Sequence, residues 1–250
     1  MRYLGLDLGW TPRDSSGGVI LEPCDTADGV PGVKVTSADS LRAHEDTLRW
    51  LARSRGRNGC VLAINAPVIV ENLSGSRPCD KLLAEHFNEY KIDEYANNTV
   101  SASHPRTLAK GLFRMGFEAN PQSDAPERIV ETHTQSAQVL LFGVDRPVRM
   151  KAGPIGGRKE GVQRLRELIV ERLYTGTPRL VPSPALDALM QAHLPDLNGT
   201  RLGELEERIE ALLVAYVATW LGENSIEGCA FLGDLTRGYI LLPDPSRLPQ

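Results

Sequence analysis

The first residues of the chain alternate between apolar and polar side chains. Leucine occupies every second position from 4 to 8, and Asp7 is the last polar residue before Gly9. A period of two is typical of a β-strand with one buried face. Short apolar runs at 18–21 and 33–36 follow, separated by turns rich in Pro, Asp and Gly. We therefore predict an antiparallel meander of three strands at the start of the chain.

Beyond the meander, the pattern predicts a helix and then a buried strand. Ser40 can cap a helix whose apolar residues lie between positions 41 and 51, and a polar stretch ends that helix. The run at 60–64 is continuously apolar and is bounded by Gly59 and Pro67. Such a run is typical of a strand that is buried on both faces and parallel to its neighbours.

The rest of the chain contains one long polar stretch and a series of shorter elements. Residues 68–126 are too rich in Asn, Ser and Pro for a simple crossover, and we interpret them as an insertion that covers one end of the sheet. The longest helix is expected at 202–221. The other expected elements are helices at about 79–90 and 108–117, a strand at 128–133, a helix at 135–142, a basic Gly-rich loop at 151–159, a helix at 161–173, a Pro-rich connector, and two short apolar runs at 229–232 and 239–242.

This order of elements predicts an α/β fold of the ribonuclease H-like type. In that fold a mixed five-stranded sheet, whose second strand is antiparallel to the others, is flanked by helices. The 250 residues fit one such domain over 1–250, with a helical and loop insertion at approximately 68–126. They leave little room for the second lobe of a typical actin-like ATPase.

The composition is that of an ordinary globular protein, with 41% hydrophobic and 24% charged residues. These values exclude a disordered or low-complexity chain. No apolar run approaches the roughly 18 residues of a membrane helix, and Asp7 lies where a signal peptide would be hydrophobic. We therefore expect a cytoplasmic protein. The four cysteines are too far apart for a zinc ribbon or a disulfide framework.

The net charge of −4 argues against a protein that binds nucleic acid chiefly through bulk positive charge. The charges are unevenly distributed, however. Residues 146–179 contain nine Lys or Arg and three Glu, whereas residues 187–234 contain nine acids and two Arg. The basic segment is therefore a candidate for contacts with phosphate groups.

Polar residues follow several of the predicted strands. Asp7 ends the first strand, Asn65 follows the buried strand, and Glu131 and His133 occupy alternate positions of a later strand. The carboxyl ends of strands in α/β sheets are the usual functional positions because a crevice opens there. Each residue alone could equally cap a turn or a helix, and their joint placement favours a site.

A further carboxylate is expected from the long helix. At about 100° per residue, Glu206 and Glu210 flank the apolar face of this helix, whereas Glu207 points more nearly to solvent. A solvated, salt-bridged helix face is the alternative interpretation of all three. Glu206 and Glu210 are therefore both candidates to join Asp7.

The predicted cluster has the chemistry of a site for Mg²⁺ or Mn²⁺. Asp7, Glu131 and one glutamate of the long helix would supply carboxylate oxygens, and Asn65 would supply a neutral oxygen. Such ions can activate a water molecule and stabilise the leaving oxygen of a phosphodiester. The three carboxylates are therefore both the predicted catalytic residues and, with Asn65, the predicted metal ligands.

Several short blocks resemble the DUF429 family, whose members are usually described as predicted nucleases with a ribonuclease H-like fold. The blocks occur in order over most of the chain. They are LGLDLGW at 4–10, AINAP at 63–67, RPCD at 77–80, VETH at 130–133, the Gly-rich stretch that begins at Lys151, and GD at 233–234 with GYI at 238–240.

The resemblance implies a metal-dependent nuclease with Asp7, Glu131 and Glu210 as its carboxylates. The family typically has Asp at position 65, so Asn65 matches by position only, and residues 207–211 carry Glu where a related helix motif has Asp. Arg77, Lys151 and His133 lie in matching blocks and are candidates for contacts with substrate or phosphate. A surface ion pair is the alternative for Arg77 and for Lys151.

Three functions are compatible with these observations. The first is a divalent-metal-dependent nuclease or phosphodiesterase that acts on nucleic acid or another phosphate-containing substrate. The second is an actin-like small-molecule kinase or ATPase resembling type III pantothenate kinases, because residues 5–11 are similar to the first phosphate motif of those enzymes; the second half of the chain lacks a matching Asp-x-Gly turn. The third is a non-catalytic binding protein with a decayed metal site, suggested by Asn65 and the acidic charge.

Overall fold

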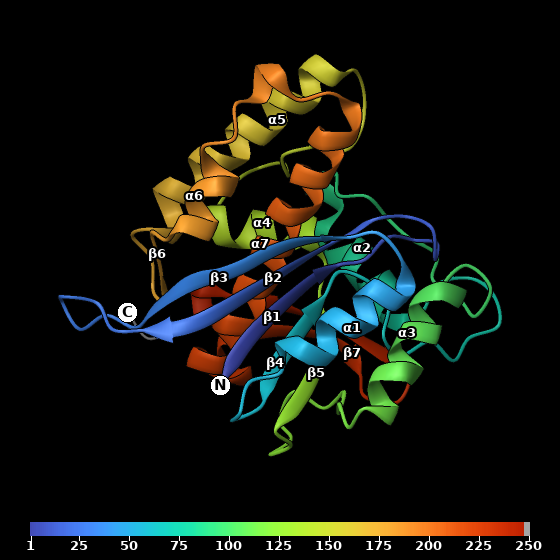
Figure 1. Cartoon of the computed structure of the whole chain (residues 1–250). Coiled ribbons are helices and arrows are strands. Elements are labelled where there is room, and N and C mark those ends of the chain that lie inside the picture. Colours follow the sequence, from blue (N-terminus) through green and yellow to red (C-terminus); the bar gives the residue numbers. More distant parts are fainter. Residues whose placement is uncertain (248–250) are drawn as a thin grey trace.

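A mixed six-stranded sheet forms the centre of the molecule in the computed structural model, which describes residues 1–247 (Figure 1). The strand order is β5-β4-β1-β2-β3-β6, with β2 antiparallel to β1 and to β3, and with β1, β4 and β5 parallel to one another. The strands are β1 (Arg2–Asp7), β2 (Ser16–Cys24), β3 (Gly32–Leu41), β4 (Cys60–Ile64), β5 (Glu127–Glu131) and β6 (Arg179–Val181).

The order of the first five strands confirms the predicted α/β fold with a mixed sheet and is compatible with a ribonuclease H-like architecture. The predicted number of five strands is wrong, because β6 adds a sixth strand parallel to β3. β6 is only three residues long and lies in the Pro-rich connector. A strand this short leaves no readable period in the sequence, and its pairing with Gly32–Lys34 creates it.

Helices cover both faces of this sheet. Leu4 and Leu6 of β1 point toward α1 and α3, whereas Tyr3, on the other face, packs with α7. The helices are α1 (His44–Ser54), α2 (Pro78–Phe87), α3 (Ser103–Arg114), α4 (Thr134–Phe142), α5 (Ile155–Leu168), α6 (Pro184–Met190) and α7 (Gly199–Asn224).

Three predicted helix starts are wrong. The helix expected at 108–117 is α3, which begins at Ser103. Ser40 does not cap α1, because β3 continues to Leu41 in its pairing with β2 and the helix begins at His44. The predicted basic loop at 151–159 ends earlier than expected, since α5 begins at Ile155 and already contains Lys159. β3 and α5 each extend beyond the apolar residues that predict them.

α7 lies unusually close to the sheet. A Cβ atom at Gly5 would lie 2.1 Å from the carbonyl oxygen of Ala211, and one at Gly17 would lie 2.1 Å from that of Glu207. Only glycine permits this approach of backbone to backbone. The close crossing brings Glu207 and Glu210 of α7 to the carboxyl end of β1.

A separate two-stranded sheet, β7 (Cys229–Asp234) and β8 (Gly238–Pro243), packs against α2 and α4. At another edge of the molecule α5 and α6 lie together beside the first half of α7 (Figure 1). α2, from the predicted insertion, contacts β7 and β8, and α3 contacts α1. Among residues 1–247, no helix combines the length and apolarity that a bilayer crossing requires.

Candidate active site

A cavity of about 360 Å³ opens at the carboxyl ends of β1, β4 and β5. Asp7 ends β1, Asn65 directly follows β4, and Glu131 ends β5, so all three lie where the sequence predicted them, and all three line the cavity. Glu210 of α7 and Lys151 also line it. Residues of the insertion, including Tyr95, form part of its wall.

The charged centre of the cavity consists of two carboxylates around one ammonium group. Lys151 forms an ion pair with Asp7, and its Nζ lies 2.8 Å from Oε2 of Glu210. Asn65 donates a hydrogen bond from Nδ2 to Oδ1 of Asp7 over 3.0 Å and accepts one at Oδ1 from the backbone N–H of Thr134 over 3.2 Å. The amide therefore fixes Asp7 and leaves its second oxygen to the cation.

The pKa values of Glu210 and Lys151 reflect these contacts. Burial, together with the neighbouring Asp7 carboxylate, raises the pKa of Glu210 to about 7, although Lys151 acts in the opposite direction. Burial lowers the pKa of Lys151, but the carboxylates of Asp7 and Glu210 outweigh this effect and raise it well above its usual value. Lys151 is therefore a charged ammonium, and the two carboxylates need a cation near them.

Glu207 differs from its predicted orientation. The helical angle placed it toward solvent, but its side chain is half-buried and lines the cavity. Ser15 donates a hydrogen bond to Oε1 over 2.6 Å, and Oε2 is buried without a partner among the described residues. The turn between β1 and β2 covers this face of α7, which the period of the helix alone does not reveal. Glu206, by contrast, forms an ion pair with Arg158 of α5.

Glu131 does not join the carboxylates of Asp7 and Glu210. Its Oε2 accepts hydrogen bonds from the Val68 N–H and from Nη1 of Arg77, each over 2.8 Å, and its Oε1 accepts one from Nη2 of Arg77 over 2.5 Å. In the described part of the chain, no three His, Cys, Asp or Glu side chains are grouped so that one ion could bind them. The predicted convergence of three carboxylates is therefore wrong, because Arg77 satisfies Glu131.

Arg77 is also not available to a substrate. It is 0% exposed, does not line the cavity, and donates to Asp80 and to the carbonyl oxygen of Ile69 as well as to Glu131. The predicted substrate contact of Arg77 is therefore wrong, because all of its hydrogen bonds are made inside the protein. Its role is structural. It ties α2 to the end of β5.

His133 lines the cavity and caps α4. Its Nδ1 accepts a hydrogen bond from the backbone N–H of Ser136 over 3.3 Å. Burial lowers the pKa of His133 to about 4, so the imidazole is neutral near pH 7. Its ring lies edge-on to Tyr95 with the centroids 6.1 Å apart. The structure therefore gives His133 a definite local role, and its predicted substrate contact stays a prediction.

The sequence interpretation missed two aromatic residues of the site, Trp10 and Tyr95, which both line the cavity with ring centroids 5.7 Å apart. Trp10 closes the LGLDLGW block at 4–10, and Tyr95 lies in the polar insertion. A large aromatic side chain within a polar loop is a signal that could have found them.

The basic segment 146–179 does not form a free cationic surface. Most of its positively charged side chains contact partners within the same chain, several of them at the surface, and the segment is therefore a poor candidate for a track of phosphate contacts. The pairs are Arg149 with Asp93, Lys151 with Asp7 and Glu210, Arg158 with Glu206, Lys159 with the Pro195 carbonyl, Arg164 with Glu167, Arg166 with the carbonyls of Leu189 and Ala192, Arg172 with Glu171, and Arg179 with Asp28.

Comparison with solved structures finds a distant structural similarity. Neither a protein-family model nor a curated protein sequence matches the chain. Among solved structures, the Thermus thermophilus RuvC structure is similar with a TM-score of 0.36 and 11% sequence identity, over 88% of this chain and 96% of that chain. Similarity at this level does not assign a function to the chain.

Proposed function

We propose that this chain is a divalent-metal-dependent hydrolase of phosphodiester bonds, a nuclease or phosphodiesterase, with its active centre at Asp7 and Glu210. One observation carries the proposal. Carboxylates from the end of β1 and from α7 already hold one cationic group between them in a cavity at the carboxyl edge of the sheet. Membership in the DUF429 family, suggested by the sequence blocks, belongs to the same proposal.

The donor set fits a hard divalent cation. Asp7 and Glu210 offer carboxylate oxygens at one position, where both contact the Lys151 ammonium. Mg²⁺ and Mn²⁺ prefer such oxygens and keep several waters, so they need few protein ligands. When bound, the ion supplies charge neutralisation and polarisation of a phosphoryl oxygen.

The other residues of the cavity act on these ligands or on the substrate. Asn65 orients Asp7 through the hydrogen bond to Oδ1. Lys151 occupies the position between the carboxylates; with a metal ion bound there, its ammonium would be released to contact a phosphate. We give Glu131 no ligand role, because both of its oxygens accept hydrogen bonds from Arg77.

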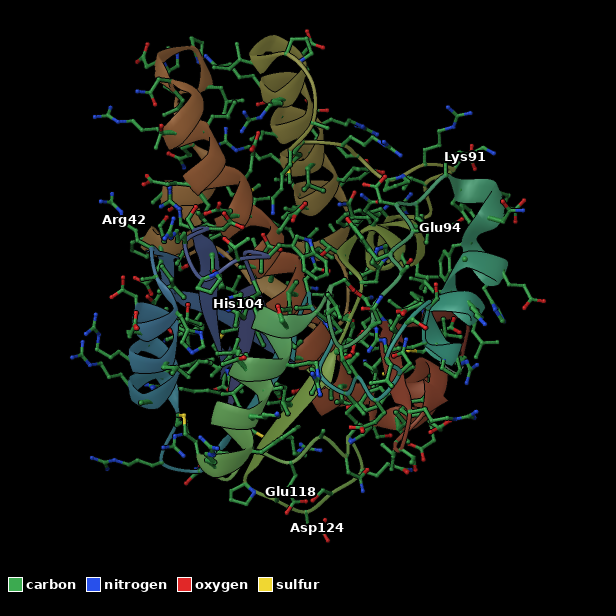
Figure 2. The ribbon with its side chains drawn as sticks, turned by 90° about the vertical axis from the view of Figure 1, so that its right-hand side faces the viewer. Arg42, Lys91, Glu94, His104, Glu118 and Asp124 are labelled. Carbon is green, nitrogen blue, oxygen red and sulfur yellow. The ribbon has the colours of Figure 1, made fainter. Side chains whose placement is uncertain are left out.

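Incubation with Mn²⁺ and labelled single-stranded, duplex and branched DNA or RNA tests this proposal. We expect cleavage by the wild type and a loss of at least a hundredfold in Asp7→Asn, because the variant removes a ligand charge. Glu204→Gln is the matched control, since Glu204 lies on the same helix but pairs with Arg42 at the surface. Figure 2 shows Arg42 projecting away from the molecule.

Equal cleavage by wild type and Asp7→Asn would contradict the proposal. Calorimetric titration with Mn²⁺ adds a second readout, in which Glu210→Gln is expected to weaken binding. If Mn²⁺ binds but no substrate is cleaved, the chain is a binding protein with a decayed site. If Mg-ATP binds in the cavity and is turned over, the kinase interpretation replaces the nuclease.

A further inference from the structure

Two large aromatic side chains are exposed at the same cavity. Trp10 is 42% exposed and Tyr95 is 43% exposed, and their ring centroids lie 5.7 Å apart with the ring planes tilted by 52°. Both residues line the cavity that contains Asp7 and Lys151. Aromatic surface is costly to leave in water, so a pair of this kind at a cavity marks a place where a ligand covers it.

The segment that carries Tyr95 is held firmly. Gln135 of α4 accepts a hydrogen bond at Oε1 from the Asp93 N–H and donates one from Nε2 to Oδ2 of Asp93, each over 2.7 Å. Arg149 adds an ion pair to Oδ1 of Asp93 over 3.1 Å. Figure 2 labels Lys91 and Glu94, which lie on this segment.

This anchoring links the aromatic pair to the charged centre. Arg149 lies two residues before Lys151, so the same short stretch contacts both the Tyr95 segment and the carboxylates of Asp7 and Glu210. The aromatic rings and the cation position are thereby connected through one short stretch of the chain. A ligand that touches both must contain a flat ring and an anionic group.

The size of the cavity and the pairing of the basic residues limit the possible ligands further. A volume of about 360 Å³ lies within the range of small-molecule sites and is too small for a duplex. Recognition of a duplex also needs several free Lys or Arg along its backbone, and those of residues 146–179 are largely paired within the protein. One nucleotide with its base unpaired satisfies both limits.

We propose that Trp10 and Tyr95 form a stacking surface for one unpaired nucleobase, whose phosphate lies at the centre formed by Asp7, Lys151 and Glu210. This inference rests on the proposed function and names its substrate class. Because the two ring planes are tilted by 52°, a base stacks on the face of one ring and contacts the edge of the other, and every base has a π-face for this contact. The nucleotide can be free or can belong to a single strand.

Fluorescence titration in the presence of Mn²⁺ tests the stacking. Trp10 is the exposed tryptophan, whereas Trp50 and Trp220 are buried, so a stacked base quenches Trp10 first. We expect AMP to quench the fluorescence and to bind about tenfold more tightly than ribose phosphate, which has no base. Trp10→Ala and Tyr95→Ala are each expected to weaken AMP binding about tenfold, and Trp10→Phe is expected to retain most of it.

Phe113→Ala is the matched control, because Phe113 is an aromatic residue with 41% exposure on α3 outside the cavity. Equal affinity for AMP and ribose phosphate, or equal effects of Trp10→Ala and Phe113→Ala, would overturn the inference. So would binding of a duplex as tightly as a single-stranded oligothymidylate of the same length. If the oligothymidylate binds more tightly than AMP, the nucleotide comes from a strand; the reverse result identifies a free nucleotide.

Calorimetry with Mn²⁺ alone separates this inference from the proposed function. If Mn²⁺ binds to the wild type and is lost in Asp7→Asn while base-dependent binding is absent, only the stacking inference fails. If AMP quenches Trp10 but Mn²⁺ does not bind, the proposed metal chemistry fails and the base-binding surface stands.

Discussion

Lys151 places a positive charge at the position that the proposed function assigns to a metal ion. Its ammonium group contacts both Asp7 and Glu210, although the lysine side chain is 42% exposed and lies in a stretch outside the helices. An ammonium and a divalent ion cannot occupy one position between the same carboxylates. The lysine is therefore a competitor of the metal within the same chain.

Replacement of this lysine is expected to strengthen metal binding. Lys151→Met removes the competing charge and should lower the calorimetric Kd for Mn²⁺ about tenfold, which corresponds to about 1.4 kcal/mol. Lys159→Met is the control, because Lys159 contacts the Pro195 carbonyl far from these carboxylates along α5. An unchanged Kd in Lys151→Met would show that the ammonium does not compete.

The raised pKa of Glu210 predicts how stability changes with pH. The folded pKa of about 7 lies above the ordinary value of 4.5, so the proton binds more tightly to the folded state. This contribution to stability is fully present below pH 4.5 and is lost as the pH rises through 7. The loss amounts to about 3 kcal/mol.

Glu210→Gln removes this dependence, because its amide carries no charge at any pH. In urea unfolding with a chelator present, we expect the variant and the wild type to be about equally stable near pH 4.5 and the variant to be about 3 kcal/mol more stable near pH 8. Parallel stability profiles for the two proteins would contradict the shifted pKa.

Strand ends and helical angles were sufficient to predict Asp7, Asn65 and Glu210 at the cavity. The helical angle failed for Glu207, and the substrate contact that the family resemblance suggested failed for Arg77. Glu207 is covered by the turn between β1 and β2 through its bond from Ser15, and Arg77 finds Glu131 far along the chain. Which charge meets which partner depends on tertiary contacts, and no local pattern encodes it.

At the scale of elements, the contact between α7 and β1 decides whether the carboxylates meet. Gly5→Ala would place a methyl group 2.1 Å from the Ala211 carbonyl oxygen and 2.2 Å from the Ala215 nitrogen, which are backbone atoms of α7. The helix must move away, at a cost of about 3 kcal/mol in unfolding free energy. The movement also separates Glu210 from Asp7.

Urea unfolding and Mn²⁺ calorimetry of Gly5→Ala check both effects. Gly157→Ala serves as the control, because Gly157 lies in α5 with no atom within 4 Å of an added Cβ. There alanine should stabilise by about 0.5–1 kcal/mol, since it favours a helix over glycine. If Gly5→Ala is as stable as the wild type and binds Mn²⁺ equally well, the close packing does not set the site.

The elements themselves differ in how well the sequence specifies them. The apolar run at 60–64 predicts β4 without error, because burial on both faces leaves a continuous pattern. Tertiary contacts, by contrast, specify β6 and the start of α1. β6 forms through its pairing with β3, and α1 begins later than predicted because β3 extends to Leu41.

At the scale of the whole molecule, the internal pairing of the basic segment predicts weak dependence of binding on salt. Lys151 and Arg149 are the basic residues that line the cavity. About two phosphate contacts give a slope of about −1.4 for log affinity against log salt with a single strand. Titration of an oligothymidylate at several salt concentrations measures it, and a slope of −4 or steeper would reveal a cationic surface elsewhere.

The sequence could show that residues 146–179 are basic, but not that their charges are satisfied within the protein. Their partners come from distant parts of the chain, as with Arg179 and Asp28 or Arg158 and Glu206. The volume and lining of the cavity therefore say more about the class of ligand than the net charge and its distribution along the sequence do.

The carboxylate pair also has a consequence for biosynthesis. Asp7 is made among the first residues of the chain, whereas Glu210 arrives only with α7, after the whole sheet. A growing chain on the ribosome therefore has no complete cation site until α7 has emerged and settled onto Gly5 and Gly17. The proposed hydrolytic chemistry therefore requires synthesis to continue through α7, and chains that end before α7 are expected to be inert.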